Sequence, residues 1–256
     1  MKKLLLPALF AALAIASVYY FSTKKECTEG PCSGKPVLLV GTADDFPPFC
    51  FNDNGEIVGF DIDVISAVAQ KLEKKLVLKN IEFDVLLLEL QSGALDAIAA
   101  GLTATEERAK RVLFTEPYLT GDVVVMLQLK GDHITPLTSP EEMKNKRVVV
   151  NTGYISDLYV TKMGINPLRV ITVSEAMLAL TSGQADVFVS AQTPLNPFFA
   201  QQSSANFIIT PIAGQEENCS LAVTKKRPEL FQQIETALQE LKQDGTIETL
   251  KKKWNL

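Results

Sequence analysis

The order of apolar segments constrains the fold more than any other feature of the sequence. Short apolar runs at 37–41, 76–79 and 97–100 alternate with the segments 61–71 and 84–91, in which apolar residues recur every three or four positions. A short apolar run is typical of a buried strand, and the longer period is typical of an amphipathic helix. Strands that alternate with helices indicate an α/β fold with a parallel or mixed sheet.

The same order of elements begins again in the second half of the chain. The stretches 90–98 and 180–188 each contain a helix end, a glycine and a strand start. Because Leu-x-Ser-Gly is common at helix ends, the repeated order of elements carries more weight than this match alone. The pattern predicts two lobes of similar topology. Its second series is a helix start at 139–142, strands at 147–150, 169–173 and 186–190, and a helix capped by Ser174 that runs through 180.

The last segments of the chain have no counterpart after the first series. They are an expected strand at 221–224 and expected helices at 228–242 and 246–254. We therefore expect them to return and complete the first lobe.

The N-terminal segment has the features of an export signal. Residues 1–3 are basic, residues 4–13 are apolar, and residues 14–16 form a small-x-small cleavage site. The apolar stretch also extends over 4–21 and is followed by two lysines, which is typical of a retained membrane anchor. Either a cleaved signal or a retained anchor places the rest of the chain outside the cytoplasm.

Charge and motifs exclude several classes of function. The formal net charge is −5 and the only basic block is 251–253, so the chain lacks the charge pattern of a nucleic-acid-binding protein. His133 is the only histidine, and the sequence contains no C-x-x-C, H-E-x-x-H, G-x-S-x-G or Walker motif. We expect no metal and no other cofactor, interpret His133 as an ordinary surface residue, and favour binding over catalysis.

Four cysteines in an exported chain permit three pairings. In one of them, Cys27 and Cys32 close a small loop near the mature N-terminus, and Cys50 and Cys219 form a disulfide across a long loop. Their number and scattered positions argue against a scaffold held together by disulfides. The pairing stays open.

The turn after the first strand is the first candidate for a binding site. In 41–49 an apolar strand runs into a turn that contains Asp44, Asp45 and Phe46. Functional side chains of α/β folds gather at the C-terminal ends of strands. A solvated pair of aspartates on a rigid turn is the alternative interpretation.

Two expected helix starts are candidates for binding an anion. Thr103 and Glu106 have capping-box spacing, and Arg108 lies one turn into the helix. Exposed N–H groups and a forked guanidinium suit a carboxylate, although such an arginine is more often a surface ion-pair partner. The segment 151–155 repeats the strand, turn and helix in the second lobe, and two helix N-termini facing each other would make a cleft positive.

Taken together, these motifs resemble the periplasmic amino-acid-binding proteins of ABC importers. The resemblance runs from about residue 37 to the C-terminus, and the motifs are specific as a set although each single motif is short. The motifs are Gly41-Thr42-x-x-x-Phe46-x-Pro48-Phe49, Gly59-Phe60-Asp61-Ile62-Asp63-Val64, Leu90-x-Ser92-Gly93-x-x-Asp96-Ala97-Ile98, Thr103-x-Thr105-x-x-Arg108, Phe114-x-x-Pro117-Tyr118 and Asp244-Gly245-Thr246.

The resemblance implies an α/β, two-lobed periplasmic-binding-protein fold of type II. Two hinge strands, near 122–125 and 214–220, would let the lobes close on a ligand. The implied parts are 1–35 as signal peptide and flexible N-terminal segment, 36–122 plus 220–256 as lobe 1, and 123–219 as lobe 2.

The resemblance also implies how the two ends of an amino acid would be held. Arg108 would bind the α-carboxylate together with Thr103 and the backbone near Ile155. Tyr154 precedes that backbone and is included in the expected site.

For the α-ammonium, the resemblance assigns the carbonyl oxygen of Gly101. The family usually adds an aspartate shortly after a strand of the second lobe, where this chain has 189–193 and Gln192. An amide oxygen accepts a hydrogen bond but brings no charge, so the contact from Gln192 is the weakest of the expected set.

For the ligand's side chain, the resemblance points to a basic amino acid. Phe46 and Phe83 match positions whose rings sandwich the side chain in members that bind such ligands, and a cation gains energy over an aromatic face. Asp44 or Asp45 would receive its cationic end. We therefore expect L-arginine or another basic amino acid.

The leading hypothesis is a monomeric, exported solute-binding protein that delivers L-arginine or another basic amino acid to the membrane permease of an ABC importer. One alternative is a cyclohexadienyl-dehydratase-like enzyme on the same fold, which would need a placed acid or base in the cleft. Another is a surface sensor or adhesive protein whose lobes no longer capture solute.

Overall fold

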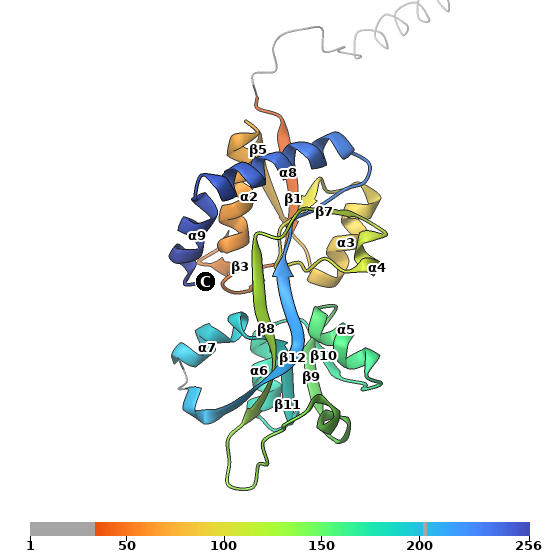
Figure 1. Cartoon of the computed structure of the whole chain (residues 1–256), viewed down its shortest axis with the longest axis vertical. Helices are drawn as coiled ribbons and strands as arrows, with labels where there is room; N and C mark the ends of the chain where they lie inside the picture. The colour runs from red at the N-terminus through yellow and green to blue at the C-terminus, as the bar shows by residue number, and fades with distance from the viewer. Residues whose placement is uncertain (1–33, 202–203) are drawn as a thin grey trace, which may run out of the picture. The chain divides into compact units, whose positions relative to one another are not determined.

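The computed structural model describes residues 34–201 and 204–256 (Figure 1). The expected export signal, the alternative anchor, and the cysteines Cys27 and Cys32 lie outside these residues. Contacts within Pro36–Leu256 make this part of the chain one compact unit, and every element named below belongs to it. Among the described residues, no helix has the length and apolar character needed to cross a membrane.

Five strands form the first sheet, in the order β5–β1–β6–β13–β7. β1 is parallel to β5 and β6, whereas β13 is antiparallel to β6 and β7. A strand from the C-terminal part of the chain thus lies within a sheet built by the N-terminal part. The bounds are Lys75–Asn80 (β5), Val37–Thr42 (β1), Ala97–Ile98 (β6), Ala222–Val223 (β13) and Leu113–Phe114 (β7).

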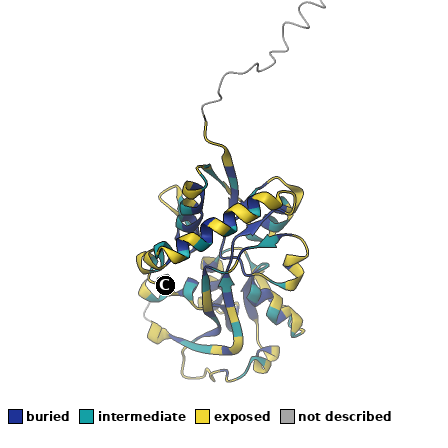
Figure 2. Ribbon diagram, turned by 45° about the horizontal axis from the view of Figure 1, so that its top comes forward, coloured by how far each residue is buried: buried dark blue, intermediate teal, exposed yellow. Residues whose placement is uncertain are grey.

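Helices with one apolar face accompany the first sheet. Residues three or four apart lie on the same side of a helix, so the buried residues of α8 form one stripe while its outer face is exposed (Figure 2). α3 ends at Gly93, which has a φ of 84° in the left-handed region that glycine adopts at little cost. The helices are α2 (Phe60–Lys71), α3 (Phe83–Ser92), α4 (Glu106–Ala109), α8 (Pro228–Gln243) and α9 (Thr246–Trp254).

The second sheet has the order β10–β9–β11–β8–β12. β9 is parallel to β10 and β11, and β8 is antiparallel to β11 and β12. Helices α5 and α6 pack against β9 and β11. The bounds are Leu168–Val170 (β10), Val148–Asn151 (β9), Val187–Ala191 (β11), Leu119–Leu129 (β8), Phe207–Cys219 (β12), Ile155–Lys162 (α5), Val173–Thr181 (α6), Asn196–Gln201 (α7), and the 3-10 helices Pro140–Asn145 (η1), Thr193–Leu195 (η2) and Ser204–Asn206 (η3).

The two longest strands, β8 and β12, connect the sheets. They pair with each other, and Cys219 at the end of β12 pairs with Leu119 and forms a bridge to Thr103 beside the first sheet. Figure 1 shows both strands running side by side from the second sheet to the first. The two-lobed α/β fold with two connecting strands that the sequence predicted is therefore confirmed.

A small third sheet carries the acidic and aromatic turn after β1. It consists of β2 (Asp45–Phe46), β3 (Cys50–Asp53) and β4 (Glu56–Val58). Gly59 follows β4 with a φ of 141°, and a Cβ there would lie 2.1 Å from the carbonyl oxygen of Phe49. Only glycine fits this close approach, which sets the position of the small sheet against α2.

Two helix caps differ from the sequence-based prediction. Ser174 does not cap α6; Thr172 does, because its hydroxyl accepts from the N–H of Glu175 while the Glu175 carboxylate accepts from the N–H of Thr172. In the same way Thr105, and not Thr103, caps α4. In each case the capping threonine lies two positions from the residue chosen by spacing, since both segments contain two Ser or Thr residues separated by one other residue.

The disulfide between Cys50 and Cys219 that one of the three pairings contains is absent, and both residues are buried free thiols. Cys50 begins β3 in the small sheet, whereas Cys219 ends β12 in register with Leu119. Different sheets therefore hold the two side chains. Burial and the neighbouring Asp61 carboxylate raise the pKa of each thiol well above its usual value, so both stay protonated.

Candidate ligand-binding site

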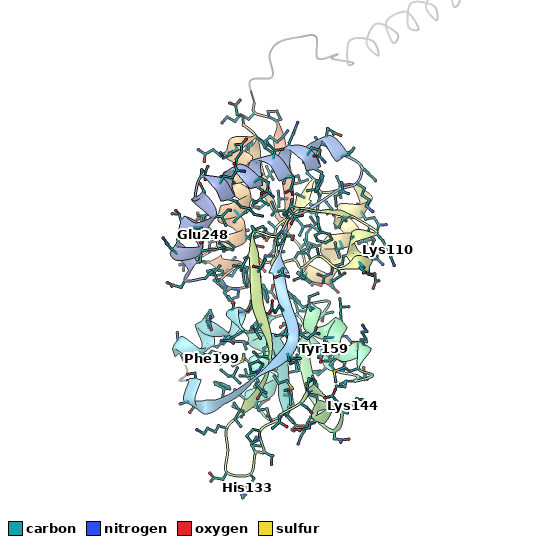
Figure 3. All side chains as sticks on the ribbon, viewed as in Figure 1. Lys110, His133, Lys144, Tyr159, Phe199 and Glu248 are labelled. Carbon is teal, nitrogen blue, oxygen red and sulfur yellow. The ribbon has the colours of Figure 1, made fainter. Side chains whose placement is uncertain are left out.

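The predicted site residues lie at the ends of strands in both lobes. Asp44, Asp45 and Phe46 follow β1, Gly101 and Thr103 follow β6, and these parallel strands end at the same edge of the first sheet. Phe83 begins α3 and Arg108 lies in α4. Tyr154 and Ile155 follow β9, and Gln192 follows β11, in the second lobe. His133 is exposed in the loop after β8, at the end of the molecule remote from these residues (Figure 3).

Arg108 joins the two lobes. Its guanidinium is held by carbonyl oxygens: Nη1 donates to Thr103 at 2.7 Å and Nη2 donates to Gly153 at 2.8 Å. Arg108 is 6% exposed, and burial lowers the pKa of its guanidinium from the usual value, although an arginine still stays charged. No ion pair among the described residues includes it. A buried cation without a carboxylate partner suits an anionic ligand.

An aromatic stack lies beside Arg108. The ring centroids of Phe83 and Tyr154 are 3.7 Å apart with an interplanar angle of 14°, and those of Phe46 and Tyr154 are 4.6 Å apart at 38°. The Arg108 guanidinium carbon lies 5.7 Å from the centroid of Phe83. The two rings expected to sandwich a ligand's side chain therefore contact the ring of Tyr154.

Gly101 is positioned by a buried carboxylate that the sequence interpretation did not select. Its N–H donates to Oδ2 of Asp61, and its φ is 58°. Burial raises the pKa of Asp61 to about 7, against the effects of this hydrogen bond and of the nearby Tyr118 hydroxyl. A Cβ at Gly101 would lie 2.8 Å from the ring of Phe46. Asp61 belongs to the motif that begins at Gly59, and that motif is the feature of the sequence by which Asp61 could have been identified as a site residue.

Thr103 is connected to the second long strand. Its hydroxyl accepts from the N–H of Asn218 at 3.2 Å, and its backbone forms a bridge with Cys219. Thr103 is buried, but the hydroxyl can still donate to a ligand because this contact uses only a lone pair.

Two carboxyl groups with raised pKa values, those of Asp45 and Glu217, lie near the aromatic stack. Burial and the neighbouring charge of Asp44 raise the pKa of Asp45 to about 6, and Glu175 in the second lobe adds to the effect. Glu217 is 4% exposed, and burial and Asp122 raise its pKa to about 8 although Arg108 opposes the rise. Sequence reasoning missed Glu217 because its neighbour Asp122 comes from a distant strand in paired register.

Gln192 lies in a different cavity from Arg108. Its N–H donates to the carbonyl oxygen of Val123, and its side chain lines a cavity of ≈ 290 Å³ with Asp122 and Asn196. A separate cavity of ≈ 160 Å³ is lined by Phe83, Asp84, Leu87, Arg108 and Gly153 among others. The structure thus brings Arg108, Phe83, Phe46 and Tyr154 together and places Gln192 elsewhere.

The comparison with protein families gives one match over nearly the whole described chain. A model of the bacterial extracellular solute-binding proteins, family 3, matches residues 38–256. Among the described residues, no group of three potential metal-binding side chains occurs.

Individual proteins are similar over most of their length. The arginine-binding extracellular protein ArtP of Bacillus subtilis (strain 168) is 28% identical over 99% of this chain and 98% of its own. The probable ABC transporter arginine-binding protein ArtJ of Chlamydia trachomatis serovar D is 32% identical over 89% of each. A solved ancestral arginine-binding protein bound to arginine is 36% identical with a TM-score of 0.77, over 86% of this chain and 98% of its own.

Proposed function

The chain belongs to the bacterial extracellular solute-binding proteins of family 3, and from this membership and the surroundings of Arg108 we propose that it captures one amino acid, L-arginine or another basic amino acid. Relatives and a solved structure that are named for arginine binding support this choice of ligand. The observation that carries the proposal is the buried guanidinium of Arg108 between the lobes without a carboxylate partner.

The ligand's α-carboxylate binds Arg108 and Thr103 in this proposal. Two of the five N–H groups of the guanidinium donate to main-chain carbonyls, which leaves others for a carboxylate. The carbonyl oxygen of Thr103 accepts from Nη1 of Arg108, and the hydroxyl of the same residue can donate a further hydrogen bond. The backbone N–H of Ile155, at the start of α5, adds a donor and the positive end of that helix, whereas the N–H of Tyr154 donates to the carbonyl oxygen of Asn151.

The α-ammonium binds the carbonyl oxygen of Gly101 and the carboxylate of Glu217. Glu217 is buried and lies close enough to Arg108 for their charges to interact. Burial raises its pKa to about 8, so its carboxyl is protonated at neutral pH without a ligand, and it supplies the negative charge that Gln192 lacks once the approaching ammonium favours the ionised form. A zwitterion placed there would pair each of its charges with a buried charge of the opposite sign, which repays part of the desolvation of Arg108 and Glu217.

The ligand's cationic side chain lies along the rings of Phe46 and Phe83 toward Asp45. Phe46 and Phe83 supply aromatic faces for a guanidinium. Asp45, beside Asp44 and within reach of the charge of Glu175, provides negative potential at the far end. A neutral side chain of similar length gains less there, so the arrangement favours arginine and lysine.

Closure and delivery complete the proposed function. The lobes 36–122 plus 220–256 and 123–219 would move about β8 and β12 where the two strands pass between the sheets. The proposed partner is the membrane permease of an ABC importer, which a monomeric protein outside the cytoplasm, in the periplasm or on the cell surface, would contact with both lobes closed.

A thermal-shift panel of the twenty common amino acids tests the ligand. A ligand that binds only the folded protein at 100 times its Kd stabilises it by about 2.7 kcal/mol, which raises Tm by roughly 5–10 °C at this chain length. We expect L-arginine to give the largest shift. A panel without any shift would contradict the proposal, and turnover of a cyclic carboxylate such as prephenate would support the dehydratase interpretation instead.

A further inference from the structure

The ring of Tyr154 occupies the space between the two phenylalanines that the proposed function assigns to a ligand's side chain. It stacks on Phe83 with centroids 3.7 Å apart and contacts Phe46 with centroids 4.6 Å apart. Tyr154 is 3% exposed, so the two rings and their surroundings enclose it almost completely. None of the cavities described above is lined by Phe46 or Tyr154. A second side chain cannot enter this space while the tyrosine stays in it, because protein interiors are close-packed.

The backbone of Gly153, directly before Tyr154, helps to hold the ring in this place. The carbonyl oxygen of Gly153 accepts from Nη2 of Arg108, and the N–H of Gly153 donates to Oδ2 of Asp157 at 3.0 Å. Gly153 has a φ of 78°, and the turn it makes directs Tyr154 away from β9 toward the first lobe. The tyrosine therefore comes from one lobe and inserts between rings of the other.

The hydroxyl of Tyr154 makes the inserted position of the ring less favourable than it would be if the hydroxyl formed a hydrogen bond. Its oxygen is buried and makes no hydrogen bond with a described residue. Most buried tyrosine hydroxyls have a partner, and leaving one without a partner is unfavourable. Stacking favours the inserted ring while the hydroxyl opposes it, so a competing group can displace the ring at moderate cost.

We propose that Tyr154 is an internal occupant of the aromatic slot, defined as the space between Phe46 and Phe83, and that a basic amino acid must displace this ring in order to bind. Tyr154 then sets how tightly the protein holds ligands with long side chains, because the apparent affinity falls with the fraction of molecules whose slot is free. Ligands with small side chains reach Arg108 and Thr103 without entering the slot. This inference rests on the proposed function.

Calorimetric titration of the full chain and its variants tests the inference. Tyr154→Ala and Tyr154→Ser empty the slot, and we expect L-arginine to bind each about five- to tenfold more tightly than it binds the wild type. The affinity for L-alanine should change far less than the affinity for L-arginine, since the alanine side chain does not reach the slot. Tyr159→Ala is the matched control, because Tyr159 lies on the same helix and packs against the core of the second lobe.

Nuclear magnetic resonance can detect directly whether the ring of Tyr154 leaves the slot. The signals of a tyrosine with a purely structural role would not change when arginine binds. In protein with 13C-labelled tyrosine, Tyr154→Phe identifies the signals of Tyr154, which the two neighbouring rings shift upfield. Addition of L-arginine should move these signals toward the values of an exposed tyrosine. Signals that stay in place while arginine binds would show that the ring remains in the slot.

The outcomes separate this inference from the function on which it rests. Wild-type protein that binds arginine, with equal or weaker binding by Tyr154→Ala, overturns the internal occupant and leaves the proposed function intact. Arginine binding by both proteins, tighter in Tyr154→Ala than in wild type, supports both. Absence of binding to every amino acid, in wild type and variants, rejects the proposed function and the inference with it.

Discussion

Nη2 of Arg108 donates a hydrogen bond of 2.8 Å to the carbonyl oxygen of Gly153. Arg108 belongs to the first lobe and Gly153 to the second, so one guanidinium contacts both sides of the proposed cleft. The same guanidinium donates to Thr103 in its own lobe. The guanidinium that is proposed to bind the ligand's carboxylate therefore also links the two lobes.

Arg108→Ala should weaken amino-acid binding about 100-fold or more, which corresponds to roughly 2.7 kcal/mol, because it removes a buried charge and its forked donors. Calorimetric titration with L-arginine measures the loss. Arg111→Ala is the control, since Arg111 lines the same cavity but is exposed. Equal affinity of Arg108→Ala and wild type would show that the carboxylate is held elsewhere.

Arginine binding should tighten as the pH rises through about 6. Burial and Asp44 raise the pKa of Asp45 to about 6, so below that pH its carboxyl is protonated and offers no charge to a guanidinium. Asp45→Asn should remove this dependence, and a neutral ligand such as glutamine should not show it. An identical pH profile in Asp45→Asn and wild type would assign the cationic end to another group.

Gly101→Ala should lower both stability and affinity. The added Cβ would lie 2.8 Å from the ring of Phe46, and overpacking of this kind costs about 1–3 kcal/mol. Gly164→Ala separates this clash from backbone strain, because Gly164 has a φ of 81° and open space around its Cβ position. We expect Gly164→Ala to lower Tm only and to leave the Kd for arginine unchanged.

Glu217→Gln should stabilise the ligand-free protein at alkaline pH. Burial raises the pKa of Glu217 from 4.5 to about 8, so the folded state binds more protons than the unfolded state between these values. Stability from this group is present below about pH 4.5 and is lost as the pH rises to 8. We expect the Tm of the variant to exceed that of wild type by roughly 10 °C at pH 8 and to match it near pH 4.

The exposed neighbour Glu216 provides the control for this measurement. Glu216→Gln should leave the dependence of Tm on pH unchanged. A parallel shift of both variants over the whole pH range would indicate a general effect of net charge instead of the burial of Glu217.

Cys50 and Cys219 should be resistant to alkylation in the folded protein and reactive after unfolding without a reductant. Both thiols are free and buried, and burial raises their pKa values well above the usual range. Peptide mass spectrometry after alkylation in denaturant locates the label. A Cys50–Cys219 peptide pair that appears only after reduction would restore the disulfide interpretation.

The regular elements and the family could be predicted from the sequence because they depend on neighbours along the chain. Apolar spacing predicted α2 to within a residue at its start, and the last helix, Thr246–Trp254, at both ends. Local motifs also selected Arg108 and Phe83 by their resemblance to a family. Spacing cannot choose between Thr172 and Ser174, which are two positions apart, so it predicts Ser174 as the cap where the structure has Thr172.

Only the tertiary structure decided which of these residues meet. Tyr154 inserts between Phe46 and Phe83, Glu217 lies near Arg108, and Gln192 faces another cavity. Such contacts join strands and turns far apart in the sequence, and they depend on how two lobes close around β8 and β12. The sequence by itself determined the α/β elements and identified Arg108 as the residue proposed to bind a carboxylate. Long-range packing decided that the ring of Tyr154 lies beside Arg108 and between the two phenylalanines.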